Sequence, residues 1–172
     1  MLRPAECSYY SNKSGRIRIN GKMEQSNRKQ PRLPGFDYSR PMYYFVTVCT
    51  AEKRKIFGEP LNLNKYGKIA ETAIQKIHEH YPSTYVDKYV VMPNHIHMIL
   101  VLEQMPEKTC SLTTVIGSLK SAVSKEIHLH CPDKEIWQRS FYDHIIRNQK
   151  DYEAIWMYIE DNPRKWIENG HD

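Results

Sequence analysis

Two histidines separated by a single isoleucine, His95 and His97, stand in the apolar run VMPNHIHMIL at residues 91–100. In an extended strand, residues i and i+2 point to the same face, so the two imidazoles would lie side by side and could bind one metal ion. The same spacing also fits two histidines that are satisfied by hydrogen bonds within the protein. Spacing alone leaves both interpretations open.

Two further His-x-His triplets, His78-Glu-His80 and His128-Leu-His130, fall in segments with helical periodicity. On a helix with 3.6 residues per turn, side chains two positions apart are separated by about 200°, so the rings of each pair diverge. We therefore expect these four histidines to lie on the surface rather than to bind a metal.

A tyrosine and an asparagine near the C-terminus, Tyr158 and Asn162, are four residues apart in the helical segment DYEAIWMYIEDNPRKW. Residues i and i+4 share one face of a helix, so both side chains would point the same way. A phenol can act as a covalent nucleophile, and an amide oxygen can join two imidazoles as a ligand for Mg²⁺ or Mn²⁺. Because Pro163 disfavours the helical conformation at Asn162, the neighbouring Asp161 is an alternative ligand.

The chain has twelve tyrosines, so the choice of Tyr158 needs a comparison. Tyr142 and Tyr152 have Ile146 and Trp156 at position i+4, and neither of these can bind a metal. We interpret both tyrosines as packing residues or as rings on which DNA bases stack. Only Tyr158 among these three has a residue of ligand type one turn further on.

The hydrophobic pattern predicts strands and helices that would hold these side chains. Pro93-Asn94, between two apolar runs, indicates the turn of an antiparallel hairpin. The order predicts an α+β fold, a ferredoxin-like split β-α-β antiparallel sheet with two helices on one face and an extra C-terminal helix that carries Tyr158. The predicted segments are strand 43–49, helix 65–81, strands 84–92 and 95–102, a helix from about residue 111 to before residue 132, strand 135–146, and helix 149–170, interrupted near residue 163.

Composition limits the protein to a small set of classes. With 172 residues, 40% of them hydrophobic, the chain fits one domain with a substantial core. The net charge of +5 is concentrated at one end, since residues 1–40 hold nine Lys and Arg against three Asp and Glu. We expect a flexible basic arm over residues 1–34 and a single domain over 35–172. The four cysteines form no C-x-x-C pair, and no apolar run is long enough to span a membrane, which favours reduced thiols and a cytoplasmic protein.

The strand VMPNHIHMIL resembles the HUH motif, in which a hydrophobic residue separates two histidines. Together with WQRSFYDHIIRNQKDYEAIWMYIEDNP, it makes the chain similar to the REP-associated tyrosine transposases, relatives of the bacterial insertion-sequence transposases that use one catalytic tyrosine. The resemblance extends from about Leu33 to Lys165 and includes the HUH strand, the W-Q-R-S-F-Y-D-H stretch and the Y-I-x-x-N-P helix in the right order.

This resemblance implies a role for each residue that matches the family pattern. His95 and His97 would bind the divalent metal, Mg²⁺ or Mn²⁺, with Asn162 as the further ligand, and Tyr158 would be the nucleophile. The family fold is a ferredoxin-like sheet, and its substrate is single-stranded DNA, often folded as an imperfect hairpin. The resemblance therefore implies a nucleoid-associated protein that acts on DNA as a monomer or homodimer, without a membrane partner.

Four further side chains could contact DNA phosphates, although each also fits an ordinary solvated or structural role. They are Lys120, Arg139, His144 and Arg147. Two hypotheses of different class remain open. The first is a metal-dependent endonuclease and strand transferase that forms a 5′-phosphotyrosine intermediate. The second is a non-catalytic module, derived from a transposase, that binds structured single strands.

Overall fold

The computed structural model describes residues 32–105 and 110–169 of the chain. Most of the basic arm that we expect over residues 1–34 lies outside these described residues and stays a prediction. The described elements, in chain order, are β1 (Tyr43–Cys49), the short turn η1 (Ala51–Lys53), β2 (Gly58–Glu59), β3 (Asn62–Leu63), α1 (Lys65–Gln75), α2 (Ile77–His80), β4 (Thr84–Met92), β5 (His95–Leu102), α3 (Leu112–His128), β6 (Tyr142–Ile146) and α4 (Gln149–Glu168).

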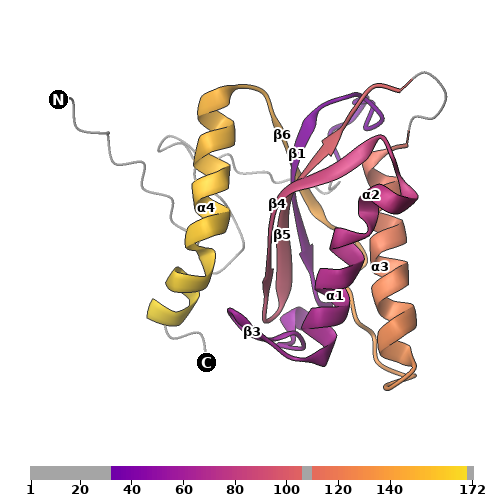
Figure 1. Ribbon diagram of the computed structural model, residues 1–172, viewed down its shortest axis with the longest axis vertical. Helices are drawn as coiled ribbons and strands as arrows, with labels where there is room; N and C mark the ends of the chain where they lie inside the picture. The colour runs from indigo at the N-terminus through magenta and orange to yellow at the C-terminus, as the bar shows by residue number, and fades with distance from the viewer. Residues whose placement is uncertain (1–31, 106–109, 170–172) are drawn as a thin grey trace. The chain divides into compact units, whose positions relative to one another are not determined.

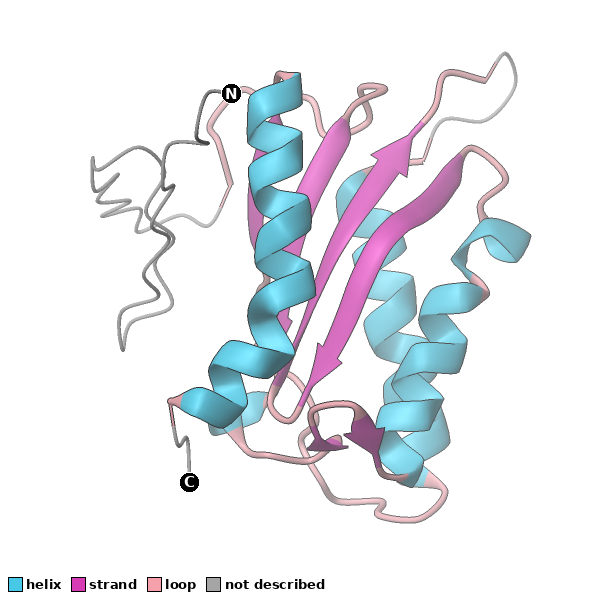
Figure 2. Cartoon of the chain, turned by 60° about the vertical axis from the view of Figure 1, so that its left-hand side comes forward, coloured by secondary structure: helices cyan, strands magenta, loops and turns pink. Residues whose placement is uncertain are grey.

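The main sheet has the strand order β4-β5-β1-β6, and every neighbouring pair is antiparallel. Strand β1 therefore lies inside the sheet, between β5 and β6. This arrangement confirms the ferredoxin-like split β-α-β prediction. Helices α1, α2 and α3 lie on one side of the sheet and α4 lies on the other (Figure 1). Figure 2 shows α4 in front of the sheet with the remaining helices behind it.

The side of the sheet beneath α1 and α3 carries the main hydrophobic core. Alternate strand residues point to this side, because side chains in a strand alternate between faces. They are fully or almost fully buried: Tyr44, Val46, Val48, Ile96, Met98, Leu100 and Leu102. Helix α3 adds a stripe of buried residues at helical spacing, and its Ser111 cap accepts a hydrogen bond from Thr114 N.

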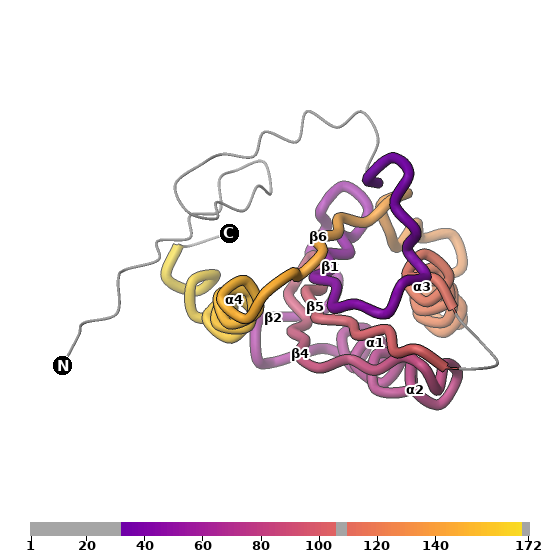
Figure 3. Tube along the Cα trace, turned by 90° about the horizontal axis from the view of Figure 1, so that it is seen from above, coloured from indigo at the N-terminus to yellow at the C-terminus, as the bar shows by residue number. Residues whose placement is uncertain are grey.

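A second, smaller apolar layer lies between the other face of the sheet and α4. Phe45 and Ile99 come from facing positions of β1 and β5, and Ile155 and Ile159 come from α4. All four side chains are buried. The view from above separates the two layers, with α4 on one side of the strands and α1 to α3 on the other (Figure 3). The chemistry-bearing side chains His95 and His97 therefore belong to the face covered by α4.

The hairpin that carries the histidines has the predicted bounds and turn. Strands β4 and β5 pair antiparallel from Met92↔His95 outward, with a bulge between Val86 and Lys88. Asn94 in the turn accepts hydrogen bonds at its carbonyl oxygen from Thr50 N (3.0 Å) and Thr50 Oγ1 (2.9 Å). The turn before His95 is thus fixed to the end of β1.

Two predicted elements have other bounds in the structure, and one small hairpin was not predicted. The strand predicted over 135–146 is shorter, because regular pairing begins only at Tyr142 and Trp137 makes an isolated bridge with Thr50. The helix predicted over 65–81 divides into α1 and α2 at Lys76. The small hairpin β2-β3 was missed, since its strands contain two residues each and carry no periodicity.

Helix α4 is continuous across Pro163, where the sequence predicted an interruption. A proline inside a helix removes one backbone hydrogen bond and bends the helix without always ending it. Figure 2 shows α4 bending toward its C-terminal end. Asn148 caps the start of the helix by accepting a hydrogen bond from Asp151 N (3.0 Å). The face that carries Tyr158 and Asn162 therefore runs unbroken along the sheet.

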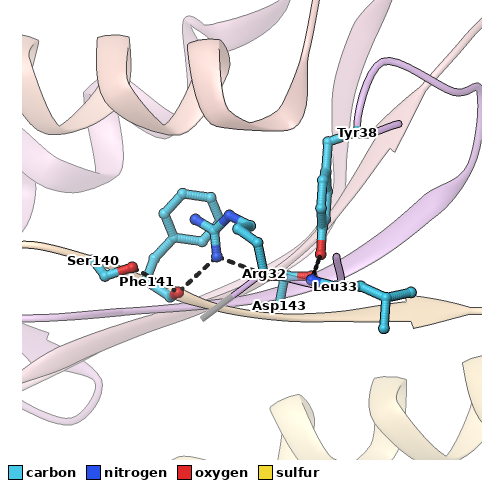
Figure 4. A network of polar contacts seen from close by, with 6 residues as sticks. All are labelled: Arg32, Leu33, Tyr38, Ser140, Phe141 and Asp143. Atoms are coloured by element: carbon cyan, nitrogen blue, oxygen red, sulfur yellow. Dashed lines mark hydrogen bonds and ion pairs between the residues drawn. The ribbon is translucent and has the colours of Figure 1, made fainter. Parts of the chain in front are cut away.

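The segment before β1 is tied to β6 through Arg32 (Figure 4). Its guanidinium lies 3.5 Å from the centre of the Phe141 ring and donates hydrogen bonds to Phe141 O (3.0 Å) and Asp143 Oδ1 (2.8 Å). Leu33 N donates to Tyr38 Oη (2.9 Å). Among the described residues, no helix has the length and apolar character that a membrane span requires.

Candidate active site

His95 and His97 lie side by side on β5, on the sheet face that α4 covers. Their ring centres are 4.4 Å apart and the ring planes meet at 70°. The strand register places His95 opposite Cys49 and His97 opposite Thr47 on β1. The side-by-side arrangement that the i, i+2 spacing predicted is therefore present in the sheet.

Each imidazole is held through its Nδ1 atom. His97 Nδ1 is hydrogen-bonded to Thr47 Oγ1 (2.8 Å), and His95 Nδ1 is hydrogen-bonded to Asn94 Oδ1 (2.7 Å). With the ring proton on Nδ1, each Nε2 keeps a lone pair for a ligand. A hydrogen bond of this kind also fixes the ring orientation, as it does for histidines that bind metals.

Both histidines are neutral near pH 7. Burial, and then the Lys53 charge, lower the pKa of His95 to about 4, and a side-chain interaction with Asn162 opposes this shift. Burial, and then the neighbouring His95, lower the pKa of His97 well below its ordinary value. Neutral imidazole is the form that binds metal ions, so burial keeps both rings ready for this role.

Tyr158 projects from α4 onto the histidine pair. Its Oη atom lies 3.4 Å from His97 Nε2, and the two ring centres are 5.2 Å apart. Phe45 packs against both rings, at 5.3 Å from His97 and 5.9 Å from Tyr158, measured between ring centres. Burial raises the pKa of Tyr158, a hydrogen bond with the Asn162 side chain lowers it, and Cys49 raises it. The phenol is therefore protonated at neutral pH.

Asn162 completes the group one turn along α4. Its side chain interacts with both His95, whose pKa it raises, and Tyr158, whose pKa it lowers. Asp161, the alternative ligand, instead lies 3.6 Å from both the Arg164 and Lys165 side-chain nitrogens. Because the backbone stays helical at Asn162 despite Pro163, the regular i+4 relation to Tyr158 holds.

The donor set fits a divalent cation. Two neutral imidazole Nε2 atoms and one amide oxygen resemble the mixed nitrogen and oxygen sets that Mg²⁺ and Mn²⁺ accept, with positions left for phosphate oxygens and water. No cluster of three or more His, Cys, Asp and Glu side chains that could hold a metal occurs within residues 32–105 and 110–169. Asn162, one turn from Tyr158, is the amide side chain that α4 brings to the histidine pair, and Cys49 pairs with His95 from β1.

A sequence model of the family described as Transposase IS200 like matches residues 38–162 of the chain. This range includes both histidines, Tyr158 and Asn162. The chain belongs to this family.

Relatives of the chain include an uncharacterized protein of Haemophilus influenzae that is 30% identical over 162 residues, with 81% of this chain and 90% of the relative covered. A REP-associated tyrosine transposase of Escherichia coli is 33% identical over 89 residues, which cover 51% of this chain and 50% of that protein. A solved structure described as a REP-associated tyrosine transposase bound to a REP hairpin superposes with a TM-score of 0.60 at 25% identity. The superposition covers 78% of this chain and 73% of that one.

Two of the four expected DNA contacts have structural partners in this IS200-like chain. Lys120 on α3 donates to the carbonyl oxygens of Gln138 (2.7 Å) and Arg139 (3.2 Å), on the sheet side away from α4. Burial, and then Arg32, lower the pKa of Lys120. His144 Nε2 lies 2.8 Å from Asp151 Oδ2 at the start of α4. Both side chains therefore hold secondary structure elements together.

The other two expected contacts, Arg139 and Arg147, are exposed. Arg139 follows Trp137 and Gln138, which bond to Thr50 and Cys49 at the His95 end of β1. Arg147 follows Ile146, which pairs with Tyr43 at the opposite end of β1. Arg139 is thus the closer of the two to the histidine pair along the sheet. A role in DNA binding stays a prediction for all four residues.

Sequence reasoning missed Thr47, Asn94 and Lys53 as supports of the site. An asparagine directly before the first histidine was a usable signal, since its side chain reaches the adjacent ring. Thr47 and Lys53 gave no local signal, because their proximity to the histidines depends on the pairing of β1 with β5. The rival Tyr152 donates to Asp87 Oδ2 (2.5 Å) on β4.

Proposed function

We propose that the protein is a metal-dependent single-stranded DNA endonuclease and strand transferase with Tyr158 as its nucleophile. The observation that carries the proposal is the approach of Tyr158 Oη to His97 Nε2, at 3.4 Å, beside His95 and Asn162. A nucleophile next to an array of neutral metal-binding groups fits phosphoryl transfer better than it fits a structural cluster.

The proposed substrate is DNA that folds as an imperfect hairpin next to a single-stranded segment. Support comes from the related structure that holds a REP hairpin, together with membership of a transposase family. Such DNA is chromosomal, so we propose that the protein acts in the cytoplasm in association with the nucleoid. Only two residues join β6 to α4, so we propose that α4 completes the active site of its own chain.

The reaction can be written with Tyr158 and the DNA alone. The Oη atom attacks the scissile phosphorus, the bond from phosphorus to the 3′ oxygen breaks, and a 5′-phosphotyrosine forms. The phenol loses one proton and the departing 3′ oxygen gains one, which leaves a free 3′-OH. A 3′-OH can later attack the phosphotyrosine and rejoin the strands, because the link keeps the energy of a phosphodiester.

His95, His97 and Asn162 are the residues that would hold the divalent cation. When bound there, Mg²⁺ or Mn²⁺ supplies positive charge that offsets the anionic phosphate and favours loss of the phenol proton. Asn162 assists directly, since its hydrogen bond lowers the pKa of Tyr158 against the effect of burial. Phe45 packs beside the phenol and limits the directions in which its ring can turn.

The first test uses hairpin-bearing oligonucleotides with single-stranded flanks, incubated with the protein and Mn²⁺ or Mg²⁺. We expect an adduct of protein and DNA that survives denaturing electrophoresis, and we expect Tyr158→Phe to abolish it while hairpin affinity changes less than about twofold. Tyr89→Phe is the matched control, because it removes a phenol hydroxyl that accepts a bond from Gln75 on the opposite sheet face.

An adduct that persists in Tyr158→Phe would contradict the assignment of the nucleophile. Hairpin binding by the wild-type protein without an adduct under either metal would instead support the non-catalytic binding module. Mapping the adducted peptide by mass spectrometry separates these outcomes from cleavage by a contaminating nuclease.

A further inference from the structure

The active site continues beyond His95 toward the loop that follows β1. Along α4, Tyr158 contacts His97, Asn162 contacts His95, and Trp166 lies 5.9 Å from His95 between ring centres. Lys55 Nζ lies 6.0 Å from the centre of the Trp166 ring. The site is therefore an ordered row that begins at the nucleophile and ends at the Thr50–Lys55 loop.

This loop is fixed firmly to the turn that precedes His95. Thr50 is fully buried and donates through Oγ1 to the carbonyl oxygens of Arg54 (2.8 Å) and Asn94 (2.9 Å). Ala51 N donates to Ile136 O (3.0 Å), and Ile56 N donates to Pro93 O (2.8 Å). Bonds on both sides of η1 thus prevent the loop from moving independently of the histidine strand.

The backbone at the tip of the loop has a conformation that ordinary residues avoid. Glu52 and Lys53 have φ values of 53° and 54°, in the left-handed region, although neither is a glycine. Such conformations are energetically unfavourable for residues other than glycine and occur often at functional sites. Here the consequence is to turn the chain sharply just after Cys49, the residue that pairs with His95.

Lys53 brings an exposed positive charge to this end of the site. Lys53 lies four residues after Cys49, which pairs with His95, and three residues after Thr50, which bonds to the turn that precedes His95. The ion pairs among residues 32–105 and 110–169 do not include Lys53. An exposed cation in a loop fixed at the His95 end of the proposed site, without a carboxylate partner among the described residues, is suited to bind an anion.

The direction of attack decides which phosphate this cation meets. In-line displacement places the leaving 3′ oxygen on the side of the phosphorus opposite the nucleophile. Tyr158 stands at one end of the row and Lys53 at the other, so the strand that carries the leaving oxygen extends toward Lys53. We propose that Lys53 binds the backbone phosphate on the 5′ side of the cleaved bond, in the segment released with a 3′-OH. This inference rests on the proposed function. It assigns a DNA phosphate to Lys53, which lies outside both the HUH strand and the tyrosine helix.

The test combines a variant with an uncharged phosphate analogue. After the cleavage site is mapped, the adjacent 5′-side phosphate is replaced by methylphosphonate, and single-turnover adduct formation is measured at subsaturating protein. For the wild type, we expect the methylphosphonate to slow adduct formation roughly tenfold. We expect the same decrease in rate for Lys53→Gln on unmodified DNA. The two changes together should cost no more than either alone, because both remove the same contact.

Three comparisons make the result specific. Lys53→Arg should recover most of the lost rate, and Lys68→Gln, an exposed lysine on α1, should behave as the wild type. Methylphosphonate on the 3′ side of the cleaved bond should slow the wild type and Lys53→Gln by the same factor. If the rate decreases caused by Lys53→Gln and by the 5′-side analogue multiply when the two are combined, the proposal is overturned.

Binding alone gives a second measurement. Removing one phosphate contact should reduce the slope of log affinity against log salt concentration by roughly 0.7–1 in Lys53→Gln. If the wild type binds the hairpin and forms no adduct, the proposed function is rejected. The salt slope still tests the role of Lys53 in that case. An unchanged slope would reject the role of Lys53, whatever the cleavage result. Lys53 is exposed, so circular dichroism should show the same fold in both variants.

Discussion

Thr47 shows how a residue without chemistry of its own can orient a proposed metal ligand. Its hydroxyl oxygen is 2.8 Å from His97 Nδ1 and lies opposite His97 in the strand register. The hydrogen bond selects the orientation of the imidazole and directs Nε2 toward Tyr158. The proposed chemistry therefore depends on a side chain from a strand that contributes neither ligand nor nucleophile.

We expect Thr47→Val to weaken Mn²⁺ binding by about 10- to 100-fold, since valine keeps the shape of threonine but removes the hydrogen bond that orients His97. Isothermal titration of Mn²⁺ into the two proteins measures the effect. Thr72→Val on α1, at an exposed position, is the control for a change of threonine to valine. Equal affinities for Thr47→Val and the wild type would show that His97 is positioned by packing alone.

Helix α4 is the element on which the site depends, because it carries Tyr158 and Asn162 while the sheet carries the histidines. Contacts at its first turn and its middle hold it against the sheet. Asp151 Oδ2 bonds to His144 on β6, and Lys88 on β4 pairs with Glu160 and lies 3.8 Å from the centre of the Trp156 ring. Only the residues Arg147 and Asn148 join β6 to α4, so a shift at this junction would move the nucleophile.

His144→Ala should destabilise the protein by about 1–3 kcal/mol, because it leaves the mostly buried Asp151 carboxylate without its partner. Urea unfolding followed by circular dichroism gives this free energy. Lys150→Ala, at an exposed position on the same helix turn, should change it by less than about 0.5 kcal/mol. If His144 instead contacts DNA, its loss should weaken hairpin binding while the unfolding free energy stays unchanged.

The main hydrophobic core and the proposed active site lie on opposite faces of the sheet. The main core beneath α1 and α3 contains none of the proposed site residues, and the smaller layer beneath α4 holds them beside Phe45, Ile99, Ile155 and Ile159. Two apolar layers stabilise the sheet without a metal. The cation would therefore add to a fold that already exists, unlike the metal of a zinc finger.

A metal that binds only the folded protein should raise its stability according to its affinity. At free Mn²⁺ about 100 times its dissociation constant, the gain is about 2.7 kcal/mol. Urea unfolding with and without Mn²⁺ measures it, and the apo protein should still unfold cooperatively. His97→Ala should lose the Mn²⁺-dependent gain, whatever its own stability. A gain of equal size in His97→Ala would place the cation elsewhere.

Much of the fold and of the candidate site followed from local patterns. The alternation in HIHMILVL indicated a strand with both histidines on one face, and the i+4 spacing linked Tyr158 to Asn162. These predictions agree with the geometry because backbone period fixes side-chain direction within one element. The predicted strand over 135–146 was too long. Trp137 and its apolar neighbours are buried in a loop, and a buried loop has the same apolar composition as a buried strand.

Contacts between distant segments had no such pattern. The pairing of Thr47 with His97, the pairing of Asp151 with His144, and the place of Lys53 beside His95 depend on strand order, register and the docking of α4. These are set by the packing of the complete chain, in which a one-residue slip of register would reverse every face. The residue types could therefore be read locally as candidates for metal binding and nucleophilic attack, while their meeting in one site required the assembled sheet and helix.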